Sequence, residues 1–116
     1  MAMIQDEKTA DGGQDVVSWP VLIDLQEGFV DDAVTVRIGE EQVFYKENVT
    51  TDLFEGRAES IEATVPEGPV TVEVSVASRH LSDKIVLNVP PVSHLGVSLS
   101  ETQLRFRVSD ESFLYF

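Results

Sequence analysis

The alternation of apolar and polar residues is clearest between Ile61 and Val76. Every second residue from 61 to 65 and from 70 to 76 is apolar, and the residues between them are polar. A period of two places alternate side chains on opposite faces of a strand. Gly68 tolerates the positive φ of a tight turn, and Pro66 and Pro69 donate no ladder hydrogen bond. The stretch therefore predicts one β-hairpin that turns at residues 66–69 and directs its valines into a core.

The same period recurs in shorter segments along the chain, separated by residues that favour turns. Gly39-Glu40 predicts a two-residue hairpin turn, because Gly stands at its first central position. Residues 47–57 lack a pattern, and a helical turn at Asp52–Glu55 with Asp52 as its N-cap is one conformation they allow. Strands are predicted at residues 21–25, 34–38, 42–46, 84–89, 95–99 and 104–108.

Regularly spaced short strands with almost no helical periodicity are typical of an all-β protein. We expect an antiparallel β-sandwich of about seven to nine short strands, immunoglobulin-like or transthyretin-like. With 116 residues, of which 42% are hydrophobic, the chain suffices for one domain with its own core. The polar residues 1–17 are expected to form a disordered N-terminal arm, and residues 18–116 the single sandwich domain.

Both ends of the predicted domain are apolar on two faces. Residues 113–116 are four large apolar residues in succession, so a strand buried on both faces is expected there. Residues 21–23 near the other end are also consecutively apolar. We expect the two segments to form a surface for self-association or for a partner. The predicted interaction surface is Trp19, Val21, Leu22, Ile23, Phe113, Leu114, Tyr115 and Phe116.

Charge and cysteine content exclude several classes of function. The chain has 21 acidic and 8 basic residues, a formal net charge of −13, which repels nucleic acid and anionic membranes. Cysteine is absent, which excludes disulfides, thiolate metal sites and cysteine nucleophiles. No signal peptide or membrane-spanning stretch is recognisable in the sequence. The compartment stays unknown, with the cytoplasm favoured.

Candidate chemistry is sparse. The two histidines, His80 and His94, lack the neighbours of a recognisable catalytic motif, so no catalytic, cofactor-binding or metal-binding residue is predicted. A calcium site would need several acidic loops to converge. The acidic candidates are Asp31, Asp32, Glu40, Glu41, Asp52, Asp110 and Glu111. A carbohydrate would need an exposed aromatic platform, for which Trp19 is the first candidate.

One run of turns and strands has a familiar order. Thr50-Thr51-Asp52, Gly56-Arg57 and Pro66-Glu67-Gly68 are followed by the alternating strand of residues 70–74. This run of about 30 residues resembles transthyretin-like sandwiches of the carboxypeptidase regulatory-like kind. The resemblance implies a non-catalytic accessory β-sandwich and assigns no functional residue.

The sequence thus favours a non-enzymatic β-sandwich module that acts through protein–protein contact, as an accessory, adaptor or assembly domain. Its partner would be another protein or a second copy in a homo-oligomer, with no cofactor. A carbohydrate- or calcium-binding module is the first alternative. A small hydrolase is the second, because 21 acidic residues leave a carboxylate pair open.

Overall fold

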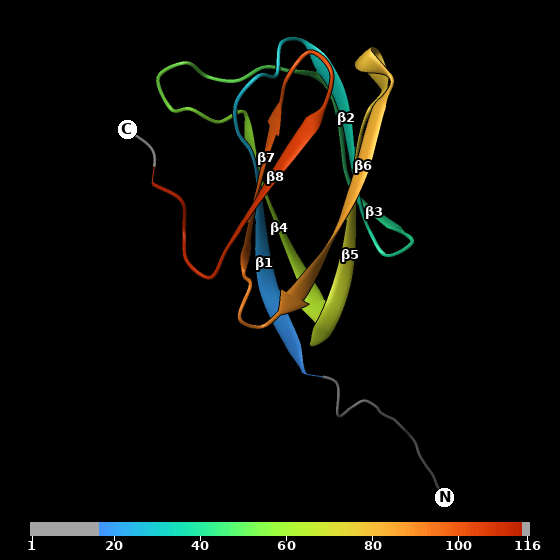
Figure 1. Ribbon diagram of the computed structural model, residues 1–116, viewed down its shortest axis with the longest axis vertical. Helices are drawn as coiled ribbons and strands as arrows, with labels where there is room; N and C mark the ends of the chain where they lie inside the picture. Colours follow the sequence, from blue (N-terminus) through green and yellow to red (C-terminus); the bar gives the residue numbers. More distant parts are fainter. Residues whose placement is uncertain (1–16, 115–116) are drawn as a thin grey trace, which may run out of the picture.

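The computed structural model describes residues 17–114, which form eight strands and one short 3₁₀ helix (Figure 1). Most of the predicted N-terminal arm, residues 1–16, lies outside the described residues. The elements are β1 (Ser18–Leu25), β2 (Asp32–Ile38), β3 (Glu41–Val49), β4 (Glu59–Pro66), β5 (Gly68–Val76), η1 (Ala77–Arg79), β6 (Leu81–Val89), β7 (His94–Leu99) and β8 (Leu104–Ser109).

The strands form two four-stranded sheets that pack face to face. One sheet has the order β4-β1-β7-β8 and the other β3-β2-β5-β6. All neighbouring strands pair antiparallel except β1 and β7, which are parallel. The expected all-β sandwich is therefore confirmed. No helix in the described part of the chain has the length and apolar character that a membrane crossing requires.

The predicted hairpin between Ile61 and Val76 is wrong. Both predicted strands exist, but β4 pairs with β1 in one sheet while β5 pairs with β2 and β6 in the other. Only Glu67 separates the two strands, so the chain crosses between the sheets instead of folding back. The prolines at both sides of this step cannot donate ladder hydrogen bonds. A period of two orients each strand toward the core but does not say which neighbour it pairs with.

The other turns agree better with the sequence. The predicted turn at Gly39 joins β2 to β3, with Ile38 opposite Glu41 and a Gly39 φ of +62°. At Asp52 the chain makes a turn without a helix. The predicted C-terminal strand is wrong for Phe113 and Leu114, which belong to no strand, and residues 115–116 lie outside the described residues.

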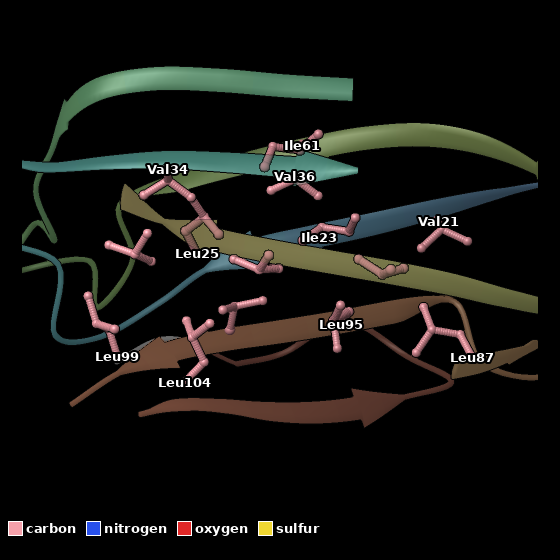
Figure 2. Packing of buried hydrophobic residues seen from close by; sticks show 14 of the residues in the cluster. Val21, Ile23, Leu25, Val34, Val36, Ile61, Leu87, Leu95, Leu99 and Leu104 are labelled. Carbon is pink, nitrogen blue, oxygen red and sulfur yellow. The ribbon is translucent and has the colours of Figure 1, made fainter. Parts of the chain in front are cut away.

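The core lies between the sheets, where side chains from both layers meet (Figure 2). Alternate residues of β5, namely Val70, Val72, Val74 and Val76, are buried as their spacing predicts. Of the other expected core residues, Val36, Val65, Leu87 and Val97 are buried. The partly exposed Ile38 and Phe106 pack against the core from its margin.

Candidate functional site

Four connections gather at one end of the sandwich, which we call the loop end: β1–β2, β3–β4, β5–β6 and β7–β8 (top of Figure 1). Thr51 of the β3–β4 connection ties two of them together. Its amide donates to the Phe29 carbonyl oxygen (2.9 Å), and its hydroxyl donates to the Gln26 carbonyl (2.7 Å) while accepting from the Phe29 amide (3.1 Å). These bonds hold the buried Phe29 side chain under the loops, where it is 1% exposed.

Arg79 of η1 joins the remaining loops. Its Nε and Nη2 atoms each lie 2.9 Å from an oxygen of the Asp32 carboxylate, in a two-bonded ion pair. The same guanidinium donates to the carbonyl oxygens of Gly28 (3.1 Å) and Ser100 (3.3 Å). One side chain therefore connects the β1–β2, β5–β6 and β7–β8 connections, as the planar donor fork of arginine permits.

The Asp32 carboxylate is completely satisfied by protein groups. It also accepts hydrogen bonds from the Ser78 hydroxyl and the Val30 amide, both at 2.8 Å. Burial by itself raises the pKa of Asp32, but the hydrogen bonds from Arg79, Val30 and Ser78 outweigh it and lower that pKa below its ordinary value of 3.8. Asp32 is thus a structural anion that stabilises the loop end.

A turn from Asp52 to Arg57 projects from this end (green, upper left of Figure 1). Asp52 Oδ1 accepts hydrogen bonds from the amides of Phe54 (2.8 Å) and Glu55 (3.2 Å). The Gly56 amide donates to the Asp52 carbonyl oxygen (2.8 Å), and the Asp52 amide donates to the Arg57 carbonyl oxygen (3.1 Å). The backbone of the turn is therefore fixed by hydrogen bonds among its own residues.

The tip of that turn carries two large apolar side chains in water. Leu53 is 92% exposed and Phe54 is 94% exposed. Val30 of the β1–β2 connection is 68% exposed, and beside it lies a pocket of about 430 Å³ lined by Phe29, Val30, Thr51, Leu53 and others. Apolar side chains that are exposed together on an ordered support mark contact surfaces in proteins. We refer to Val30, Leu53 and Phe54 as the apolar tip.

The sequence-predicted interaction surface is only partly a surface. Val21 and Ile23 lie in the core at 1% and 0% exposure, because they belong to the inward-facing set of β1. Leu22 is half-buried on the other face, beside His94 of β7. Trp19 is 37% exposed, and its indole nitrogen donates to Glu67 (3.1 Å).

The C-terminal part of that predicted surface divides similarly. The half-buried Phe113 ring packs edge-on against His94, with 6.2 Å between ring centroids, and His94 is the strand neighbour of Leu22. Leu114 is 78% exposed, so a central strand position does not bury it, and its burial by a second copy or a partner stays a prediction. Tyr115 and Phe116 lie outside the described residues.

The acidic loops do not meet at one end as a calcium site would need. Asp31, Asp32 and Asp52 lie at the loop end, whereas the turns at Glu40-Glu41 and Asp110-Glu111 lie at the other. Within residues 17–114, no group of three or more His, Cys, Asp or Glu side chains could hold a metal ion.

Neither histidine stands in a triad-like arrangement in the described chain. The exposed His80 follows η1 with a φ of +56°. His94 Nδ1 lies 2.8 Å from the hydroxyl of the adjacent Ser93, and its ring contacts Phe113.

Sequence reasoning missed the apolar tip. Leu53-Phe54 stands among turn-forming residues and follows no strand or helix period, so its pattern predicts neither a strand nor a contact surface. Two large apolar residues inside a predicted turn are unusual, because tight turns in water usually carry polar or small side chains. This combination is the feature of the sequence that could have indicated the surface. Arg79 and Asp32 were also missed as a pair, because 47 positions separate them.

Comparisons of the chain with protein-family models, with curated proteins and with solved structures gave no match in any of the three.

Proposed function

We propose that this protein is a non-catalytic β-sandwich module that works through protein–protein contact and binds its partner with the apolar tip. The observation that carries the proposal is the 92% and 94% exposure of Leu53 and Phe54 on a turn held by Asp52. Because the hydrogen bonds of Asp52 already fix the backbone of the turn, binding through Leu53 and Phe54 costs little backbone entropy. The tip is therefore suited to anchor in an apolar pocket of another protein.

Charge favours a protein partner over a lipid surface. The net charge of −13 opposes approach to an anionic membrane. The exposed acidic side chains Glu27 and Asp31 also lie beside the tip, whereas Glu55 is paired with Arg57 of the same turn (3.6 Å). A partner pocket with basic residues at its margin would complement this arrangement and speed association.

Among the sandwich types that the sequence suggested, we propose the transthyretin-like one. Immunoglobulin domains place their first two strands in the same sheet. Here β1 and β2 lie in opposite sheets, and each sheet has four strands. The run that resembles the transthyretin-like domains also crosses from one sheet to the other between β4 and β5.

Site-specific photocrosslinking tests the proposed contact. A photoreactive phenylalanine analogue would replace Phe54 in the full chain, and the matched control would carry it at Val86. Val86 is an apolar residue of β6 that is 57% exposed and pairs with Thr71, in the half of β5 that lies farther from the loop end. We expect position 54 to capture a discrete protein that position 86 does not, and that protein is then identified and purified.

The purified partner decides the outcome. It should bind the unmodified chain, and Phe54→Ser should weaken that binding about 30-fold, as expected for a hot-spot residue. Equal capture from both positions, or an affinity that Phe54→Ser leaves unchanged, would contradict the proposal. Sedimentation of the chain alone shows whether the captured protein is a second copy.

A further inference from the structure

A second hollow lies on the outer face of the β4-β1-β7-β8 sheet, and Glu27 separates it from the pocket beside the apolar tip. It has a volume of about 510 Å³ and is lined by residues of the β1–β2 connection, β7 and β8. Gly96 and Ser98 alternate with the buried Leu95, Val97 and Leu99, so they face outward from β7. Gly96 opposes Arg107 on β8, and Ser98 opposes Arg105.

The missing side chain at position 96 leaves room that the Gln26 carboxamide partly occupies. A Cβ atom at Gly96 would stand 2.6 Å from Gln26 Oε1, which is closer than atoms can pack. Gln26 is itself buried, at 6% exposure. The base of the hollow is therefore a packed, polar surface rather than a gap between mobile side chains.

The hollow is basic although the chain is strongly acidic. Its lining includes two arginines, Arg105 and Arg107, against one carboxylate, Glu27, whereas the whole chain has a net charge of −13. Within residues 17–114, Arg105 forms no ion pair or hydrogen bond, and neither arginine pairs with Glu27. Two of the chain's eight basic residues thus face one hollow with donors to spare.

Phe113 orients one of these donors in advance. The Arg107 guanidinium carbon lies 4.5 Å from the Phe113 ring centroid. A cation–π contact uses the face of the guanidinium plane and leaves the N–H groups at its edge available. Holding the plane in place reduces the rotamer entropy that Arg107 would lose on binding a ligand.

We propose that this hollow is a binding site for a carboxylate group, carried by a small organic acid or by an acidic side chain of a peptide. Arg105 and Arg107 donate in-plane N–H groups to the two carboxylate oxygens, and Ser98 supplies a neutral hydroxyl beside them. A single negative charge suits the site better than the double charge of phosphate, because Glu27 and the surrounding acidic surface repel each added charge. This site is separate from the apolar tip and does not depend on the proposed function.

Solution NMR of the full chain with acetate, which carries one carboxylate, as the probe tests the proposal at constant ionic strength. We expect saturable shifts of the Arg105 and Arg107 Nε–H signals, with a dissociation constant of about 1 mM. Arg105→Gln should weaken binding about tenfold. Arg37→Gln removes the same charge from an exposed site in the other sheet and should change affinity less than about twofold.

Further probes separate the sources of the carboxylate. Tighter saturation by acetate supports a small acid, and tighter saturation by a blocked Gly-Glu-Gly peptide, which also carries one carboxylate, supports an acidic segment of a partner. The absence of saturation up to ~50 mM of either probe would overturn the proposal. Equal weakening by Arg105→Gln and Arg37→Gln, or equally tight binding of inorganic phosphate, would overturn it as well.

Discussion

Two phenylalanines at the same end of this molecule have opposite surroundings. Phe29 in the β1–β2 connection is 1% exposed, and its backbone is bonded on both sides to Thr51. Phe54 in the β3–β4 connection is 94% exposed, and its backbone is held by Asp52. Both loops are ordered by hydrogen bonds, but only the first buries its aromatic ring.

The difference separates stability from binding. Burial of Phe29 contributes to folding through the water-excluded area of its ring. The Phe54 ring gains nothing of this kind in the free chain, although its support is equally well defined. An exposed ring on a fixed turn adds little to the stability of the free chain, and this is the reason for our proposal that it contacts another protein.

The largest expected effect is on the buried side of this comparison. Phe29→Ala should lower the free energy of unfolding by about 3–5 kcal/mol, because it removes a large side chain and leaves a cavity. Phe54→Ala should change it by less than about 0.5 kcal/mol. Urea unfolding of both variants measures the contrast. Similar losses in the two variants would show that the Phe54 ring packs on the fold in solution.

Arg79→Ala should follow, with a loss of about 3 kcal/mol. The substitution leaves the Asp32 carboxylate, whose side chain is 3% exposed, without its counter-charge, which is the costly way to break an ion pair. The expected loss is at the lower end of the range for buried ion pairs, because the Arg79 side chain is 24% exposed. The double variant Arg79→Met with Asp32→Asn should recover part of the loss in the same urea measurement, whereas an additive loss would mean that the two groups do not interact.

The lowered pKa of Asp32 predicts a specific dependence of stability on pH. A carboxyl group with a lowered folded pKa stabilises above its ordinary pKa of 3.8 and loses this contribution as the pH falls through the folded value. The difference in unfolding free energy between the natural chain and Asp32→Asn should therefore be largest above pH ~5 and shrink below the ordinary pKa. If the difference in unfolding free energy between the two chains grew as the pH falls, the folded state would not stabilise the charged form of Asp32, contrary to the prediction.

A smaller effect is expected at the support of the exposed ring. Asp52→Ala removes the acceptor for the amides of Phe54 and Glu55 and should cost about 1 kcal/mol. Asp52→Asn keeps an oxygen at that position and should cost less than half as much. Faster amide hydrogen exchange at Phe54 in Asp52→Ala alone would show that the carboxylate orders the turn, and unchanged exchange would show that it does not.

The strands were predictable from the sequence because their period is local. Each strand alternates between a core face and a solvent face, so Val72 and Val74 are identified without knowledge of their neighbours. The sheet that each strand joins was not predictable in this way. The step from β4 to β5 at Glu67 has the composition of a hairpin turn, yet the two strands belong to different sheets.

The candidate site was harder to predict for a physical reason. Asp32 and Arg79 meet only through the packing of three connections, and no spacing in the sequence encodes that meeting. Leu53 and Phe54 break no helix or strand pattern, because they lie in neither. The apolar run at the C-terminus predicted a strand. Apolar character alone does not determine whether a sheet edge is available for pairing, and the last strand, β8, ends at Ser109.

The most direct test of the central claim measures partner affinity and unfolding free energy on the same Phe54→Ser chain. The partner is the protein captured at position 54, and Val86→Ser is the matched control on β6. We expect Phe54→Ser alone to lose about 2 kcal/mol of binding free energy. The unfolding free energy of both variants should stay within about 0.5 kcal/mol of that of the natural chain. Unchanged binding, or a binding loss matched by an equal loss of stability, would contradict the central claim.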